Sequence, residues 1–253
     1  MTTRVIGVIS GKGGVGKTVV SINTAAALHR YYNFRVLLID CNITTSHLGL
    51  YLGLYSTPVT LNDALQGKVG IEKTIYEHQT GVHVIPASLR LEDLKNVDWH
   101  IMKERIKPLH DKYDFIILDS SPGFNRESLI TLQASDEVIM VTTPIVHHIA
   151  DVIKCKQLCK ELDIRPIGIV LNMTKNRKYE LTRHEVEQMT ELPVFTTLPY
   201  DEAVLQSIIY KMPVINHSKK MSRHFLDISK FIVGGDLPEE EGFFSGLRRL
   251  LWR

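Results

Sequence analysis

Residues 11–18 read GKGGVGKT, and they lie between the β-branched run VIGVI at 5–9 and a helical pattern that begins at Thr18. The glycines at positions 11, 13, 14 and 16 let backbone N–H groups turn inward and approach phosphate oxygens without a Cβ in the way. A loop that opens directly into a helix also places the positive end of the helix dipole beside the anion. Strand, loop and helix together predict a site for a nucleoside triphosphate.

The residues of this loop have distinct expected roles. Lys17 is expected to contact the β- and γ-phosphates, and the hydroxyl of Thr18 is expected to bind Mg²⁺. The other expected contacts with the nucleotide come from Gly11, Lys12, Gly13, Gly14, Val15, Gly16 and Val19. Lys12 has no necessary role in binding phosphate within a single chain.

The presence of Lys12 carries a resemblance to a known group of proteins. The loop resembles that of the deviant Walker A ATPases, the branch of the P-loop proteins that contains MinD and ParA. In that group a lysine at this position reaches across a dimer interface to the partner's nucleotide. The resemblance therefore implies a homodimer that forms on ATP binding, with Lys12 and Lys17 both acting on ATP. The alternative is that Lys12 is only a solvated loop lysine.

Composition restricts the class of protein. The 253 residues are 44% hydrophobic and 23% charged, with a formal net charge of +2, which is typical of one large α/β core. No apolar run approaches the roughly 18 residues of a membrane-spanning helix, and the N-terminus leads straight into a predicted strand without a signal peptide. We therefore expect a cytoplasmic protein. Near-neutral charge does not favour general nucleic-acid binding, although a local basic patch stays possible.

The three cysteines do not predict a disulfide framework in such a chain. Cys155 and Cys159 share one helix face, but neither a second pair nor a suitably spaced histidine follows, so ordinary helix packing is the better interpretation. His147 and His148 at the start of the same helix are interpreted as surface or cap-region residues.

Short apolar runs alternate with longer helical patterns along the chain. The predicted strands are at 5–9, 35–39, 82–85, 115–118, 138–141, 167–171 and 194–195. The predicted helices are at 18–30, 99–110, 146–162, 183–190, 203–209 and 219–233. This alternation predicts an α/β fold, a mostly parallel twisted sheet with helices on both faces, and ligands at the carboxyl ends of its strands.

The second predicted strand ends at Asp40, and the segment that follows resembles switch I of the family. The family usually has Asp-x-Asp here, and its second aspartate orients the attacking water. The corresponding residue is Asn42, which can orient water but cannot accept its proton at neutral pH, so hydrolysis is expected to be slow or dependent on a partner. Asp40 is expected to hold a water bound to Mg²⁺. The alternative is that Asn42 only caps a turn.

The stretch FIILDSSPG at 115–123 resembles the Walker B strand and switch II of the family. Asp119 is expected to bind Mg²⁺ through water, and Pro122 with Gly123 forms a turn that can rearrange when the γ-phosphate leaves. The alternative for a strand-terminal aspartate is a helix N-cap.

Two later segments resemble the adenine-binding elements of the family. Asn172 would pair its amide with adenine N6 and N7, which distinguishes ATP from GTP. Pro199, Tyr200 and Asp201 would contact the base mainly through the backbone. Asn172 could instead be a turn residue, and Asp201 suits a helix N-cap better than a ligand.

The end of the chain differs in composition from the rest. Residues 234–241 contain glycines, a proline and three glutamates, which predicts a flexible acidic linker after an ATPase domain at 1–233. Residues 242–253, GFFSGLRRLLWR, predict a short basic amphipathic helix that suits an anionic bilayer surface. This helix resembles the membrane-targeting sequence of MinD proteins. Its expected membrane contacts are Phe243, Phe244, Leu247, Arg248, Arg249, Leu250, Leu251 and Trp252.

One such helix is too short to anchor a monomer firmly. Two helices on one dimer make the second insertion intramolecular, which raises avidity by about 10²–10⁴. ATP would therefore control membrane residence by controlling dimerisation. The alternative is a tail that packs on its own domain or in a partner's groove.

Together these features predict a MinD-like ATPase. ATP-bound dimers would reside on the inner face of the cell membrane, recruit a protein activator or cargo and leave after hydrolysis, and the family uses this cycle to position division sites or surface organelles. One alternative is an ATP-binding scaffold with little turnover, which Asn42 would permit. Another is a ParA-like DNA-partition ATPase, prompted by basic residues at 175–183 and 219–223, although nucleic-acid binding is the less favoured interpretation.

Overall fold

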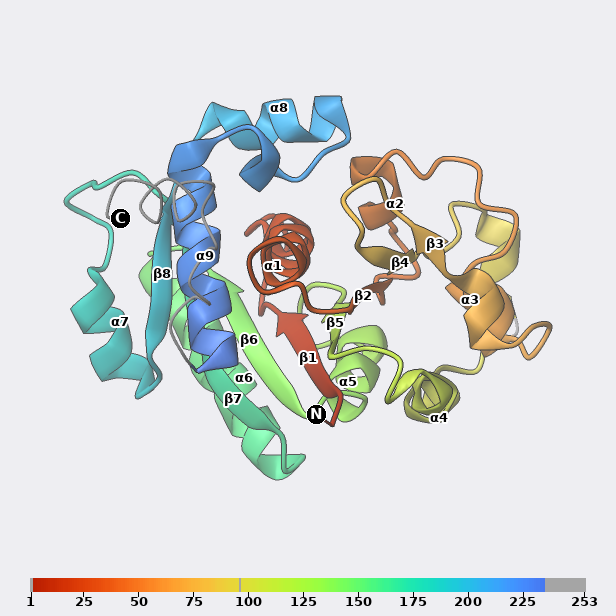
Figure 1. Cartoon of the computed structure of the whole chain (residues 1–253). Coiled ribbons are helices and arrows are strands. Elements are labelled where there is room, and N and C mark those ends of the chain that lie inside the picture. The colour runs from red at the N-terminus through yellow and green to blue at the C-terminus, as the bar shows by residue number, and fades with distance from the viewer. Residues whose placement is uncertain (1, 96, 235–253) are drawn as a thin grey trace, which may run out of the picture.

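The computed structural model describes residues 2–95 and 97–234 (Figure 1). The strands are β1 (Arg4–Ile9), β2 (Val36–Asp40), β3 (Tyr76–Glu77), β4 (His83–Ile85), β5 (Phe115–Asp119), β6 (Glu137–Thr142), β7 (Arg165–Thr174) and β8 (Val194–Pro199). The α-helices are α1 (Lys17–Tyr32), α2 (Leu48–Tyr51), α3 (Leu61–Leu65), α4 (Met102–Ile106), α5 (Arg126–Gln133), α6 (Val146–Glu161), α7 (Arg183–Thr190), α8 (Glu202–Tyr210) and α9 (Lys219–Val233).

The strands form one sheet in the order β3-β4-β2-β5-β1-β6-β7-β8. Every neighbouring pair is parallel except β3 with β4, which is a short antiparallel pair at the edge. Parallel neighbours cannot be joined by tight turns, so the chain crosses the sheet faces between strands and covers both of them. The predicted α/β fold class is confirmed.

Strand β2 shows how one apolar run supplies both sides of the core. Val36 and Leu38 pack with α1 and α9 on one face, whereas Leu37 and Ile39 pack with α3 and α4 on the other. Successive side chains of a strand point to opposite faces, so a strand buried on both sides must be apolar throughout. Figure 1 shows α1 and α9 on the near side of the sheet.

Some predicted elements differ from those observed. The predicted helix at 99–110 is interrupted: only α4 is α-helical, and it lies between 3-10 turns at Trp99–Ile101 and Lys107–Leu109. Pro108 in the second turn cannot donate a backbone hydrogen bond and restricts the residue before it, which ends α4. Four of the observed α-helices and strands were not predicted: α2, α3 and β3, which are too short to show a periodic pattern, and α5.

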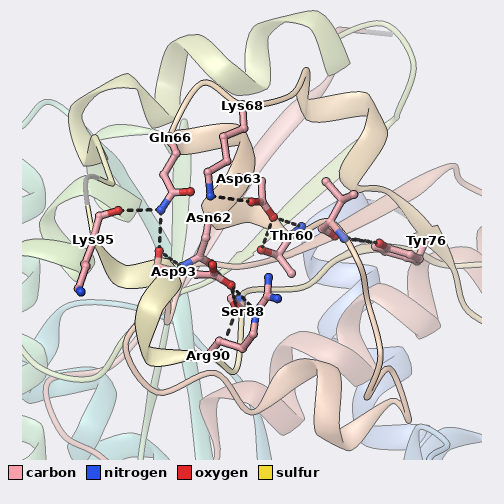
Figure 2. Close-up of polar contacts among 11 residues, drawn as sticks. Thr60, Asn62, Asp63, Gln66, Lys68, Tyr76, Ser88, Arg90, Asp93 and Lys95 are labelled. Atoms are coloured by element: carbon pink, nitrogen blue, oxygen red, sulfur yellow. Dashed lines mark hydrogen bonds and ion pairs between the residues drawn. The ribbon is translucent and has the colours of Figure 1, made fainter.

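Buried polar groups fix the loop that follows β4 (Figure 2). Asn62 of α3 is fully buried; its Nδ2 donates to the carbonyl oxygen of Asp93 (3.1 Å) and its Oδ1 accepts from the backbone N–H of Ser88 (2.9 Å). The carboxylate of Asp93 accepts from Ser88 Oγ (2.6 Å) and from Arg90 Nε (2.8 Å). A buried amide without such partners would cost free energy, so these contacts hold the loop against α3.

Candidate nucleotide-binding site

The loop between β1 and α1 has the conformation that its glycines permit. Gly14 and Gly16 have φ angles of 79° and 88°, a region that side chains with a Cβ rarely adopt. A Cβ on Gly16 would also lie 2.2 Å from Asn172 Nδ2, closer than two atoms can approach. Gly16 is therefore required for both the backbone angle and the close contact with β7.

A cavity of about 340 Å³ lies against this loop and the first turn of α1. The loop side is formed by Gly13, Gly14, Val15, Gly16, Lys17, Thr18 and Val19. The opposite side includes Asn42, Thr45, His47 and Tyr51, from the segment between β2 and the end of α2. Lys17 is buried at 7% exposure, so its positive charge faces this enclosed space rather than bulk solvent. Helix dipole, loop amides and Lys17 make the cavity suited to an anion.

Two aspartates end neighbouring strands at the same edge of the sheet. The register of β2 and β5 pairs Asp40 with Asp119, and both are buried at no more than 1% exposure. Asp40 Oδ1 accepts from the backbone N–H of Asn42 (3.0 Å), and Oδ2 accepts from Ser46 Oγ (2.6 Å). Burial, and to a smaller extent the negative charge on Asp119, raise the pKa of Asp40 to about 7.

Asp119 has the environment of a cation ligand. Its Oδ1 accepts from Ser21 Oγ of α1 (2.8 Å), whereas its Oδ2 is buried without a hydrogen bond from any residue in 2–95 or 97–234. Burial raises the pKa of Asp119, and the charge on Lys17 and the hydroxyl of Thr18 oppose this rise. Mg²⁺ typically takes one or two protein oxygens and completes its shell with water and phosphate. Thr18 and the unpaired Oδ2 of Asp119 fit such an ion. The predicted role of Asp40 in holding one of its waters stays a prediction, because both of its oxygens accept hydrogen bonds within the protein.

Comparison with known proteins agrees with this geometry. A family model described as an AAA domain matches residues 3–163. An uncharacterized ATP-binding protein of Methanocaldococcus jannaschii is 36% identical over 210 residues, which cover 83% of this chain and 79% of the relative. The cell division ATPase MinD of Pyrococcus furiosus has a TM-score of 0.88 at 29% identity and covers 91% of this chain and 98% of its own. This chain belongs to the MinD/ParA family of P-loop ATPases.

A second solved structure of the MinD/ParA family bears on the ligand. The septum site-determining protein MinD of Pyrococcus horikoshii, complexed with Mg-ADP, has a TM-score of 0.87 at 27% identity. The match covers 91% of this chain and 96% of that one.

The two lysines of the loop have different surroundings in this MinD/ParA ATPase. Lys17 is buried beside Asp119, whereas Lys12 is exposed on the surface. The loop residue before Lys12 packs against α6, because a Cβ on Gly11 would lie 2.3 Å from Asp151 Cβ. Lys17 thus lines the cavity, whereas Lys12 is exposed to solvent.

The structure gives Asn42 a structural role beside the cavity. Its Nδ2 donates to the carbonyl oxygen of Thr45 (2.7 Å), and its Oδ1 accepts from Thr45 Oγ1 (3.0 Å). Asn42 therefore caps a turn, which is the alternative that the sequence left open. Because Asn42 also lines the cavity, this role does not remove it from the site.

The predicted adenine-binding residues line a second hollow of about 60 Å³, which shares Gly16 and Val19 with the first. Asn172, Pro199, Tyr200 and Asp201 are all part of its lining. Asn172 Nδ2 donates to the carbonyl oxygen of Val15 (2.7 Å), which joins β7 to the P-loop. Base recognition by Asn172 stays a prediction.

Asp201 has the structural role that the sequence favoured. It is the N-cap of α8, where its Oδ1 accepts from the backbone N–H of Ala203 (3.0 Å). Its other oxygen pairs with Lys220 of α9 (2.9 Å).

The predicted helix-packing role of Cys155 and Cys159 is likewise confirmed, since both are buried in the apolar core beneath α6.

Sequence reasoning missed several side chains that support the site. Ser21 lies one turn after Lys17 on the same helix, so the i, i+4 spacing could have identified it. Ser46 contacts Asp40 only because the chain turns back at residues 42–45, and no local pattern indicates that. Apart from Gly234, the predicted linker at 234–241 and the predicted membrane helix at 242–253 lie outside the described residues. None of the helices in 2–95 and 97–234 has both the length and the apolar character needed to cross a bilayer.

Proposed function

We propose that this chain is a MinD-like ATPase that binds ATP with Mg²⁺, dimerises and hydrolyses the γ-phosphate slowly. The observation that carries the proposal is the pairing of Asp40 with Asp119 at the ends of adjacent strands, beside Lys17 and Thr18 of the loop. Lys17 and Thr18 line the cavity, and the two buried carboxylates lie directly behind them; these are the groups that phosphoryl transfer from Mg-ATP requires.

The protein's groups have separate tasks in hydrolysis. Lys17 and the loop amides stabilise the charge that develops on the phosphate oxygens, and bound Mg²⁺ would neutralise the β- and γ-phosphates. Asn42 orients the attacking water through its amide but takes no proton from it. We therefore propose slow hydrolysis that a protein partner accelerates.

Lys12 supports dimerisation as part of this cycle. An exposed lysine at the edge of a nucleotide cavity can reach the phosphates of a second molecule docked against the loop. The proposal is that two chains bind face to face around two ATP molecules, each supplying Lys12 to the other.

The tail at 242–253 supports a location on the inner face of the cell membrane. Its apolar face and arginines suit anionic lipids, and two tails on a dimer bind far more tightly than one. ATP binding would thus bring the chain to the membrane as a peripheral protein, where it positions a protein cargo in cell division or surface-organelle placement.

Light scattering of the eluting protein tests the dimer. The full chain with ATP is expected to elute at twice the mass seen with ADP, and Lys12→Ala is expected to stay monomeric while still binding a fluorescent ATP analogue. Lys73→Ala, an exposed lysine on a distant 3-10 turn, is the matched control. A monomer in ATP, or a dimer that Lys12→Ala leaves intact, would contradict the proposal.

The turn-capping contacts of Asn42 favour one second candidate, an ATP-binding scaffold with little turnover. Phosphate release distinguishes the two functions: a wild-type rate clearly above that of Lys17→Ala would exclude the scaffold, and a wild-type rate no higher than that of Lys17→Ala would support it. The structure gives less support to DNA binding, because two residues of the basic clusters are already in ion pairs: Lys220 pairs with Asp201 (2.9 Å) and Arg183 with Glu187 (3.1 Å). DNA affinity that fell steeply with salt would revive it.

A further inference from the structure

Glu127 is a buried carboxylate that the proposed chemistry does not use. It lies in the first turn of α5 at 8% exposure and does not line the nucleotide cavity. Its Oε1 accepts a hydrogen bond from Thr44 Oγ1, 83 residues earlier in the chain. Burying a carboxylate costs free energy unless a hydrogen-bonding or charged partner compensates for the lost water.

The surroundings of this carboxylate come from both switch segments. Burial raises the pKa of Glu127, and its contact with the Thr44 hydroxyl opposes this rise. The second oxygen, Oε2, is buried without a hydrogen bond from any residue in 2–95 or 97–234, and Ser121 Oγ reaches the same helix end by donating to Asn125 Oδ1 (2.7 Å). Thr44 belongs to switch I, and Ser121 belongs to switch II. Glu127 therefore lies where the two segments meet.

On the switch I side, Glu127 contacts Thr44 in the turn at 42–45, and Asn42 of the same turn lines the cavity. Asn42 and Thr45 close this turn with two mutual hydrogen bonds, and the backbone N–H of Asn42 donates to Asp40. Thr44 lies between these anchor points. The contact of Glu127 with Thr44 therefore restrains the turn, and with it the orientation of Asn42 at the nucleotide cavity.

On the switch II side, α5 is joined to the segment that follows Asp119. Asn125, the N-cap of α5, accepts through its Oδ1 from the backbone N–H of Ser128 (2.9 Å) and from Ser121 Oγ (2.7 Å). The backbone N–H of Gly123 donates to the carbonyl oxygen of Ser10 at the P-loop (2.9 Å). A shift of switch II thus moves the first turn of α5, and Glu127 with it.

We propose that Glu127 is a positioning residue that links switch I to the helix after switch II, so that the two segments rearrange together. The proposal rests on the proposed function, because the link matters only if the site turns over ATP. In the linked state Glu127 holds the 42–45 turn in the geometry that orients water. When switch II moves, the same contact transmits the change to Asn42.

Hydrogen–deuterium exchange of the nucleotide-free full chain tests the link without requiring activity. Glu127→Ala and Thr44→Val are each expected to speed exchange of a peptide spanning 41–52 about tenfold, because a charge-assisted contact of this segment is lost. Glu127→Gln keeps one acceptor oxygen and should have a smaller effect. Peptides from β7 and α9 should be unchanged, and Glu161→Ala on the exposed end of α6 is the control.

Steady-state kinetics of ATP hydrolysis then distinguish a positioning role of Glu127 from a general loss of stability. Glu127→Ala and Thr44→Val should each lower kcat for ATP about tenfold with KM changed less than about threefold, because the substrate still binds but the water is misplaced. The double variant should be no slower than the slower single variant, since both remove one contact. Unchanged exchange at 41–52, uniformly faster exchange, additive losses in kcat or an effect on KM alone would each overturn the link. If the wild type released no phosphate, the proposed function would fail, and exchange at 41–52 would still decide the link.

Discussion

Replacing Asp40 with Asn should stabilise the nucleotide-free protein and weaken its activity. Asp40 is fully buried beside a second carboxylate, and burial with that repulsion raises its pKa from 3.8 to about 7. An asparagine can keep both present contacts: its Oδ1 can accept from the backbone N–H of Asn42, and its Nδ2 can donate to Ser46 Oγ. The substitution therefore removes a buried charge and keeps a hydrogen bond to each neighbour, although the Ser46 hydroxyl, which now donates to Asp40, becomes the acceptor and must turn its own proton elsewhere.

The magnitude follows from the pKa shift of Asp40. Each pKa unit is worth about 1.4 kcal/mol, so the buried charge costs about 4 kcal/mol at pH 8 and about 2 kcal/mol at pH 5. Between about pH 4 and pH 7 the folded state binds more protons than the unfolded state, so wild-type stability should fall as pH rises through this window. Asp40→Asn should remove this contribution to the pH dependence.

Urea unfolding followed by circular dichroism, in EDTA at pH 5 and pH 8, measures the effect. Asp40→Asn is expected to gain about twice as much free energy of unfolding at pH 8 as at pH 5, and to hydrolyse ATP more slowly than wild type. Asp227→Asn, on the exposed side of α9, is the control and should change stability by less than about 0.5 kcal/mol. A loss of stability at pH 8, or an equal gain at both pH values, would refute the reasoning.

Three further predictions concern single positions. Gly16→Ala should weaken binding of a fluorescent ATP analogue at least about tenfold, because the new Cβ would clash with Asn172 at a positive φ angle. Asn62→Ala should lower the free energy of unfolding in urea by about 2 kcal/mol, since it leaves the backbone N–H of Ser88 without its acceptor and removes one of the two donors to the carbonyl oxygen of Asp93, the other being Gln66 Nε2. Asn42→Asp should raise steady-state phosphate release about tenfold or more, because a carboxylate can draw on the proton of the attacking water.

Each of these predictions has a matched comparison. Gly14→Ala has the same backbone strain but no atom within 4 Å of its new Cβ, so it should weaken nucleotide binding less than Gly16→Ala. Lys68→Ala removes the ion pair of the exposed Lys68 with Asp63, the residue after Asn62, and should cost less than about 1 kcal/mol. Nucleotide affinity of Asn42→Asp should stay close to that of wild type. Three results would contradict the assignments: an equal loss of nucleotide affinity in Gly14→Ala and Gly16→Ala, an equal loss of stability in Lys68→Ala and Asn62→Ala, or an unchanged rate of phosphate release in Asn42→Asp.

The sequence predicted the parts of the fold that rest on long apolar periodicity. The strand at 36–40 is apolar on both faces and ends in Asp40, so both its burial and the position of its carboxylate could be predicted. The helix at 126–133 was missed, although Asn125 as N-cap and the apolar spacing at Leu129, Ile130 and Leu132 were signals for it. Elements of four or five residues, such as α2 and α3, are stabilised by tertiary packing and leave no periodic signal.

The candidate site likewise contains residues that local sequence patterns predict and contacts that they do not. The P-loop and the two strand-terminal aspartates follow local patterns, so the sequence could bring them together through the rule for parallel sheets. The contact of Glu127 with Thr44 spans 83 residues and depends on a turn at 42–45, which no local pattern determines. Whether Asn42 capped a turn or faced the nucleotide was also open, and the structure shows the cap at the edge of the cavity.

Co-sedimentation with anionic liposomes tests the central claim most directly. Full-length protein and a version ending at residue 241 are compared in ATP and in ADP, with Phe195→Leu, a substitution in the apolar core, as a control for altered folding. The account predicts sedimentation of the full-length chain in ATP, little in ADP, and none without residues 242–253. Equal binding in both nucleotides, or binding that persists without the tail, would contradict control of membrane residence by ATP.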